Sequence, residues 1–210
     1  MKAEVLAQAR WPLDSTADDL PQIAGFVESA FSPLIAAIAD LCLSGFYGEP
    51  PARHEEGERT AIVLASATGD IPTAVAVAAA VQAGRRVPPL LFYQSNPNAV
   101  AGYVAARWGL SGPVVCTMPG RSDPGSVTDA SSRALAEARA TADLLIGDGD
   151  ADAALVVAAN AYLSGAIDAA AELIGPPSWS PRATRTAAGT VMPAKSIRAD
   201  LAAGNKGATR

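Results

Sequence analysis

The chain has 210 residues, half of them hydrophobic, which is enough to build one complete hydrophobic core. Its formal net charge of -5 comes without a basic stripe, so we expect no nucleic-acid partner. The N-terminus lacks the long apolar stretch of a signal peptide, and no run of about 18 uncharged apolar residues occurs. We therefore expect a cytoplasmic protein with no membrane partner.

The first part of the sequence predicts a strand, a helix and a linker. Residues 3–13 predict an opening strand. Residues 26–43 place apolar side chains at helical spacing and predict a long helix, which ends in the glycines and prolines of residues 45–51. Residues 53–59 are mostly charged and predict a solvated linker.

From residue 60 onward, the pattern alternates between strands and helices. Residues 60–66 form a short, continuously apolar run, which predicts a strand buried on both faces. Asp70 is a suitable cap for a helix over residues 74–82. The intervening stretch lacks the three-glycine fingerprint and the Gly-Lys-Ser/Thr ending of phosphate-binding loops. We interpret it as a strand-to-helix turn and expect no cofactor.

The next elements complete an α/β order. The apolar stretch Val87–Tyr93, interrupted by two prolines, leads into a small-residue helix over residues 97–108. The apolar residues 114–116 predict another strand. A helix over residues 131–145 and a strand over residues 153–158 follow.

One stretch has a specific pattern: residues 97–113 read Pro-Asn-Ala-Val-Ala-Gly-Tyr-Val-Ala-Ala-Arg-Trp-Gly-Leu-Ser-Gly-Pro. It resembles the beta-ketoacyl synthase family, in which these motifs precede the strand that carries the nucleophilic cysteine. A second match is Gly149-Asp-Ala-Asp152, followed by an apolar strand. The resemblance covers about residues 59–161. The residues that match the first motif are Pro97, Asn98, Gly102, Arg107, Trp108, Gly109, Gly112 and Pro113.

The resemblance implies an α/β fold that is a single N-terminal half of a thiolase-like fold, with a mixed sheet flanked by helices. We expect residues 1–174 to form this half-domain, with residues 59–161 as its motif-supported core. Residues 175–210 change in composition to proline, threonine, alanine and basic side chains, and we expect a flexible C-terminal tail.

The nucleophile of an active ketosynthase has no counterpart at the matching positions. Counting forward from Gly112-Pro113 places the family's cysteine near Arg121, whereas counting back from Gly149 places it near Ser132. The two counts differ because residues 119–130 carry an insertion of roughly ten residues relative to the family pattern. We interpret both positions as a degenerate nucleophile elbow.

We interpret the other chemically active side chains as structural or surface residues. Cys116 lies inside a predicted strand, where a thiol is packed rather than presented. His54 is the only histidine and lies in the charged linker, whereas the family's two catalytic histidines come from the second half of the full-length fold. Asp148, Asp150 and Asp152 lack the remaining ligands of a calcium loop, so we expect a turn and no metal.

The resemblance extends to truncated ketosynthase-like subunits of type II polyketide and aryl-polyene systems, whose role is that of chain-length factors. It implies a non-catalytic subunit that forms a heterodimer with a full-length ketosynthase. Through that partner it would serve an acyl carrier protein and shape the acyl tunnel in polyketide or fatty-acid-type biosynthesis.

The resemblance also implies which residues reach the tunnel or the interface. In ketosynthases the segment matching residues 88–93 crosses the dimer interface toward the partner's acyl tunnel. An alternative is that its apolar side chains fill this chain's own core. The candidates for the tunnel and interface are Leu90, Leu91, Phe92, Tyr93, Asn98 and Gly102.

Two other functions stay open at this level. The chain can be read as an acyl-thioester hydrolase or transferase that uses Ser132 or Cys116. Covalent labelling by an acyl donor would indicate that function. It can also be read as a module that binds an acyl group or an acyl carrier, which a stable monomer with ligand-dependent melting would indicate.

Overall fold

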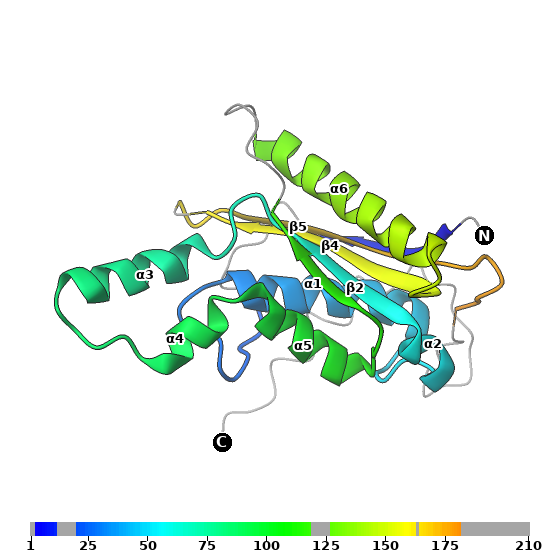
Figure 1. Ribbon diagram of the computed structural model, residues 1–210, viewed down its shortest axis with the longest axis horizontal. Helices are drawn as coiled ribbons and strands as arrows, with labels where there is room; N and C mark the ends of the chain where they lie inside the picture. The colour runs from blue at the N-terminus through cyan, green and yellow to red at the C-terminus, as the bar shows by residue number, and fades with distance from the viewer. Residues whose placement is uncertain (1–2, 12–19, 119–126, 163, 182–210) are drawn as a thin grey trace, which may run out of the picture.

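The computed structural model describes residues 3–11, 20–118, 127–162 and 164–181. Five strands form one mixed sheet in the order β1-β5-β4-β2-β3 (Figure 1). Strands β3, β2 and β4 are parallel, β5 is antiparallel to β4, and β1 is antiparallel to β5. The strands are β1 (Glu4–Arg10), β2 (Thr60–Ala65), β3 (Val114–Thr117), β4 (Ala153–Ala161) and β5 (Ile167–Gly175).

Helices cover both faces of the sheet within the described residues. Helix α6 covers one face, and α1 and α5 cover the other, whereas α3 and α4 project beyond the end of β2 (Figure 1). None of the described helices is long and apolar enough to cross a membrane. The helices are α1 (Phe31–Tyr47), α2 (His54–Glu58), α3 (Ile71–Gln82), α4 (Pro89–Gln94), α5 (Pro97–Trp108) and α6 (Val127–Gly147).

The two central strands explain the apolar runs of the sequence. Every residue of β2 and β4 is buried, because both strands lie between helices on the two faces. Both predicted strands are therefore confirmed, and β4 extends three residues beyond the prediction. On the α6 face, Ala134, Ala138 and Ala142 recur every four residues and are fully buried. Their small side chains let α6 pack closely on the sheet.

The other face carries the larger core. It consists of side chains from α1, α5 and the facing side of the sheet, with Trp108 the largest fully buried side chain. The helix predicted over residues 97–108 is confirmed, and Gly109 ends it in the left-handed conformation at φ 66°. The predicted cap is confirmed too, because Oδ1 of Asp70 accepts a hydrogen bond from the Thr73 backbone N–H at 3.1 Å.

Strand β5 was not predicted from the sequence, because charged Asp168 and Glu172 interrupt its apolar run. The tertiary structure accommodates Glu172 through Arg139 of α6, whose Nη1 lies 2.7 Å from the Glu172 carboxylate. The ion pair lets an acidic side chain lie on a covered face of the sheet.

The structure contains two short helices that the sequence did not predict. The apolar stretch Val87–Tyr93 was assigned no element, and its residues from Pro89 onward form helix α4, with Pro89 in its first turn. The charged linker contains the five-residue helix α2. In the expected tail, Trp179 packs against the core and the Ser180 carbonyl accepts a hydrogen bond from Arg53. Residues 182–210 lie outside the described residues, and the domain boundary stays a prediction.

Candidate functional site

The connection from β3 to α6 is where a ketosynthase nucleophile would lie. Of the two elbow positions, Arg121 falls outside the described residues. Ser132 is exposed in the first part of α6. Neither position carries a thiol, so the nearest thiol in the sequence is that of Cys116 in β3.

Cys116 lies in an environment that opposes thiolate formation. Its side chain is half-buried, and its Sγ lies 3.0 Å from Oδ1 of Asn98 in α5. Burial raises the pKa of the Cys116 thiol. Catalytic cysteines have a lowered pKa instead, because cationic groups or helix N-termini stabilise their thiolates. The hydrogen bond to Asn98 also explains part of the Pro-Asn motif, because it joins α5 to the edge strand.

Near about pH 8, we expect iodoacetamide to alkylate the Cys116 thiol more slowly than it alkylates the thiol of glutathione. The alkylation rate of Cys116 should increase as the pH rises further. The reason is that a raised pKa leaves less thiolate at a given pH: each increase of one in the pKa lowers the thiolate fraction about tenfold. Mass spectrometry of the wild type and Cys116→Ser measures the rate. Cys42 serves as an internal control, since burial raises its pKa to about 12. Labelling of Cys116 faster than glutathione would indicate an activated nucleophile.

Helix α4 separates its apolar side chains into two sets. Leu91 is buried at 8% exposure, whereas Leu90, Phe92 and Tyr93 are 44%, 79% and 60% exposed. Leu91 therefore belongs to this chain's own packing, and the other three side chains do not. The alternative that all four fill the core is wrong. Whether the exposed three reach an acyl tunnel stays a prediction.

Helix α5 bears the other two interface candidates, and both are exposed. A Cβ built on Gly102 would meet nothing within 4 Å among the described residues, so no described backbone approaches Gly102 closely. Asn98 is exposed as well, and its side chain bonds Cys116.

Arg107 and Trp108, the Arg-Trp pair of the motif, join α5 to α1 because both bond to Asp40. The fully buried Trp108 donates from Nε1 to Oδ1 of Asp40 at 2.6 Å, and Arg107 Nε lies 3.0 Å from the same oxygen. The carboxylate of Asp40 raises the pKa of Arg107 further. Asp40 gave no sequence signal, because its partners lie 67 and 68 residues away.

Asp40→Ala is expected to cost about 1–3 kcal/mol of unfolding free energy, because it leaves the buried indole N–H of Trp108 unpaired. Asp40→Asn is the matched control. It keeps an oxygen acceptor for Trp108 and loses only the exposed ion pair with Arg107, at about 0–1 kcal/mol. Urea unfolding followed by tryptophan fluorescence measures both. Equal losses for the two variants would contradict the assigned role of the indole hydrogen bond.

The turn from β2 into α3 is a closed hydrogen-bond network. Ser66 Oγ accepts from the Gly69 N–H at 2.8 Å, and Oδ1 of the fully buried Asn160 accepts from the Ala67 N–H at 2.9 Å. A phosphate cradle needs such backbone N–H groups free. In this turn they are used within the chain, as a strand-to-helix connection requires.

The remaining candidates are surface groups. His54 is 84% exposed at its side chain and lies 3.5 Å from Glu58 within α2. Near the expected turn of aspartates, Arg59 donates to the Gly149 carbonyl and to Asp152. This contact joins the start of β2 to the start of β4.

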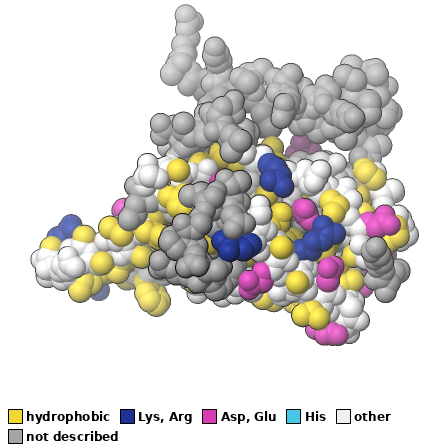
Figure 2. Space-filling model, turned by 90° about the horizontal axis from the view of Figure 1, so that it is seen from above, with side chains coloured by type: hydrophobic (Ala, Val, Ile, Leu, Met, Phe, Trp, Pro, Cys, Tyr) yellow, Lys and Arg dark blue, Asp and Glu magenta, His cyan; other side chains and the backbone are white. Residues whose placement is uncertain are grey.

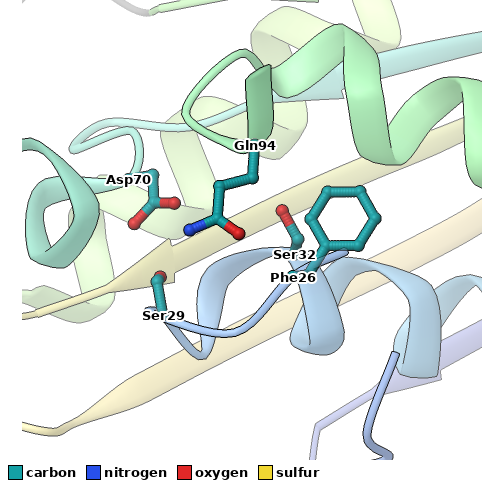
Figure 3. A pocket seen from close by; sticks show the side chains of 5 residues that line it. All are labelled: Phe26, Ser29, Ser32, Asp70 and Gln94. Atoms are coloured by element: carbon teal, nitrogen blue, oxygen red, sulfur yellow. The ribbon is translucent and has the colours of Figure 1, made fainter. Parts of the chain in front are cut away.

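A polar pocket lies where three segments meet, and it was not predicted from the sequence. It lies between the start of α1, the turn into α3 and the end of α4 (Figure 3). Its parts are 24 to 68 residues apart in the chain, and each is an ordinary polar or aromatic residue in the sequence. The lining residues are Phe26, Ser29, Ser32, Asp70 and Gln94.

The mixed sheet, with α6 on one face and α1 and α5 on the other, forms an α/β unit in which Gly112-Pro113 leads into the edge strand β3. No protein-family model matches the chain, and no curated protein matches its sequence. Solved structures do match, and they define the class: the chain has a ketosynthase-like, thiolase-type fold.

Three similar structures illustrate this class. The ishigamide ketosynthase/chain length factor matches with a TM-score of 0.58 and 20% identity over 80% of this chain and 50% of that chain. A beta-ketoacyl synthase from Burkholderia phymatum matches with a TM-score of 0.55 and 17% identity over 81% of this chain and 52% of that chain. The ketosynthase ApeO in complex with its chain length factor ApeC, from Xenorhabdus doucetiae, matches with a TM-score of 0.53 and 17% identity over 77% of this chain and 63% of that chain.

These matches confirm the expected fold class. This chain spans between half and two thirds of the length of these three chains. At such low sequence identities the similarity establishes the fold, and the activities of the longer proteins do not follow from it.

Proposed function

We propose that this chain is a non-catalytic, ketosynthase-like subunit that pairs with a full-length ketosynthase and helps to shape its acyl tunnel. The observation that carries this proposal is an exposed apolar surface beside an unpaired sheet edge. We call this surface the apolar edge. It comprises Val75 and Val81 of α3, Leu90, Phe92 and Tyr93 of α4, Val114 of β3, and Met118.

The apolar edge begins on β3. This strand is the last in the sheet order, so one of its sides has no strand partner among the described residues. Val114 on this strand is exposed, and so is Met118 just beyond it. The Met118 methyl lies 3.8 Å from where a Cβ on Gly69 would stand, so the edge strand adjoins the turn into α3. An open strand edge with apolar side chains favours pairing with another chain.

The apolar edge continues along α3 and α4. Helix α3 reads Ile-Pro-Thr-Ala-Val-Ala-Val-Ala-Ala-Ala-Val-Gln, yet only Thr73 and Ala80 of it are buried. Figure 2 shows hydrophobic side chains along this projecting end, whereas most acidic side chains in view lie over the body of the molecule. A surface helix without a partner normally has a polar outer face. The composition of α3 therefore supports its coverage by a partner.

The comparisons support the kind of partner. Two of the three similar structures are described as a ketosynthase together with a chain length factor. A chain of this class that presents Phe92 and Tyr93 outward is suited to placing aromatic side chains in a neighbouring subunit. There they would limit the space for a growing acyl chain, which in such systems is delivered by an acyl carrier protein.

Co-expression with a candidate full-length ketosynthase, followed by size-exclusion chromatography with mass measurement, tests the pairing. We expect one complex with equal amounts of the two chains. Separate elution of both proteins at micromolar concentration would contradict the proposal for that ketosynthase.

The purified chain alone is expected to form no carbon–carbon bond from an acyl and a malonyl thioester. Burial raises the pKa of the Cys116 thiol, and Ser132 replaces the thiol at one elbow position. The assay follows condensed product by mass spectrometry, with an active ketosynthase as positive control. Product from this chain alone, lost in Cys116→Ser or Ser132→Ala, would instead support the acyl-transferase alternative.

A further inference from the structure

The projecting part of the molecule differs in charge from the rest of the chain. We call residues 71–94, which span α3 and α4, the arm. The arm contains no aspartate and no glutamate, and its only charged residues are Arg85 and Arg86, whereas the whole chain has a formal net charge of -5. Figure 2 shows basic side chains at this projecting end, next to hydrophobic ones.

Arg85 and Arg86 lack the ion pairs that other arginines of the chain make. Both are exposed, and neither side chain bonds any described residue. The C-terminus of α3 attracts a basic side chain, but it does not account for an arm without any acidic one. Unpaired arginines beside exposed aromatic side chains are typical of a surface that another protein covers. Four other described arginines are each paired with a carboxylate of this chain: Arg53, Arg59, Arg107 and Arg139.

The backbone holds the two arginines at a fixed place between α3 and α4. Gly84 follows the end of α3 in the left-handed conformation at φ 63°, and the Arg85 N–H donates to the Ala80 carbonyl at 2.9 Å. Two prolines come next, and the Pro88 carbonyl accepts from the Leu91 N–H at 3.0 Å as α4 begins. A short connection that is hydrogen-bonded at both ends loses little conformational freedom when it binds a partner.

The chemistry of the arm selects the class of its occupant. Guanidinium groups bind carboxylates and phosphates, so the occupant is acidic where it meets the arm. Anionic membranes recruit clusters of about four to eight basic residues, and two arginines on an acidic chain are too few. Nucleic acid requires a basic stripe, which the described residues do not form. The apolar edge also includes the side of β3 that has no strand partner among the described residues, and only another polypeptide supplies backbone groups for it.

We propose that the subunit covering the apolar edge carries aspartate or glutamate side chains where it meets Arg85 and Arg86, and that this contact decides which subunit is accepted. That the subunit is a ketosynthase rests on the proposed function. Exposed Val81 and Phe92, on either side of the arginines, supply contact area but distinguish poorly between apolar partners. Opposite charges at a fixed place accelerate association with an acidic partner and repel a basic one.

Charge reversal tests the role of this contact. Biolayer interferometry on an immobilised full-length ketosynthase measures the association rate constant of the intact chain. We expect Arg85→Glu and Arg86→Glu each to lower this constant about fivefold or more at about 50 mM NaCl. The difference from the wild type should shrink at about 500 mM NaCl, which screens exposed charges.

Arg10→Glu is the matched control. Arg10 is exposed on β1, which lies at the opposite edge of the sheet from β3, so the same change in charge there should leave the association rate at the wild-type value. Equal losses for Arg10→Glu and Arg86→Glu would overturn the inference, because only the net charge of the chain would then matter.

A carbodiimide crosslink identifies the partner's groups directly. Arg86→Lys keeps the positive charge and adds a primary amine, which the reagent couples to a carboxylate in contact with it. Mass spectrometry should find residue 86 of this variant joined to an aspartate or glutamate of the ketosynthase, and residue 10 of Arg10→Lys joined to none. A complex that forms without this crosslink and is insensitive to Arg86→Glu would refute the inference and leave the proposed function standing. Failure of the wild-type chain to form any complex would overturn the proposed function for that ketosynthase, and the inference with it.

Two further outcomes would change the occupant. Phosphatidylcholine vesicles with about a quarter phosphatidylserine that bind the wild type but not Arg86→Glu would replace the protein partner by a lipid surface and overturn the inference. A dimer of the isolated chain that forms with rising concentration and is lost in Arg86→Glu would support an acidic subunit. It would identify that subunit as a second copy, against the proposed ketosynthase.

Discussion

Gly112→Ala is expected to destabilise the folded chain by about 3 kcal/mol or more, enough to remove most soluble protein. A Cβ at this position would lie 2.5 Å from the Thr60 carbonyl oxygen, 2.6 Å from the Thr60 carbonyl carbon and 2.8 Å from the Ala61 nitrogen. All three are backbone atoms at the start of the central strand β2. They cannot move without breaking the parallel pairing of β2 with β3 and β4.

This close approach explains the Gly-Pro part of the motif. The Gly112 N–H donates to the Thr60 carbonyl at 3.2 Å, and the Pro113 carbonyl accepts from the Ile62 N–H at 2.8 Å. The two backbones are thus hydrogen-bonded where β3 begins. Only a residue without a side chain fits between them.

Gly102→Ala, in the same motif, is the matched control. A Cβ there meets nothing within 4 Å in the described part of the chain, and alanine stabilises a helix interior by about 0.5–1 kcal/mol relative to glycine. Urea denaturation or thermal unfolding followed by circular dichroism measures both variants. The interpretation fails if Gly112→Ala retains wild-type stability, or if Gly102→Ala loses as much as Gly112→Ala.

Leu91→Ala and Phe92→Ala are expected to affect different properties, stability for the first and partner binding for the second, although the residues are adjacent. Leu91 is buried, so its truncation should cost about 2–5 kcal/mol of unfolding free energy and reduce soluble yield. Phe92 is 79% exposed, so Phe92→Ala should leave the stability of the isolated chain within about 0.5 kcal/mol. In a complex, Phe92→Ala should weaken partner binding by about 2 kcal/mol or more, as expected for a buried aromatic anchor.

The product made by an assembled complex tests the tunnel role separately. If Phe92 and Tyr93 limit the acyl tunnel, alanine at either position should lengthen the product, as measured by mass spectrometry. Leu90→Ala, on the same exposed side of α4, extends the series. Unchanged product lengths for all three variants in an intact complex would rule out the tunnel role and leave a subunit that only stabilises its partner.

The sequence alone determined those features that depend on local chemistry. The continuous apolar runs predicted β2 and β4, because a strand buried on both faces has no polar side to alternate. Asp70 and Gly109 marked the ends of two helices through local capping geometry. The resemblance of residues 97–113 to the beta-ketoacyl synthase family implied the fold class, which the structural comparisons confirmed.

Only the tertiary structure decided the features that depend on distant partners. Strand β5 was not predicted, because Glu172 interrupts its apolar run. In the folded chain, Arg139 of α6 forms an ion pair with Glu172. The run from Leu90 to Tyr93 is uniformly apolar, and only the direction of α4 separates a buried leucine from two exposed aromatic side chains. The pocket is lined by residues from 26–32 together with Asp70 and Gln94, and no local sequence pattern indicates that these residues lie close together. Capping and periodicity act within a few residues, whereas ion pairs, burial and pockets require the chain to be folded.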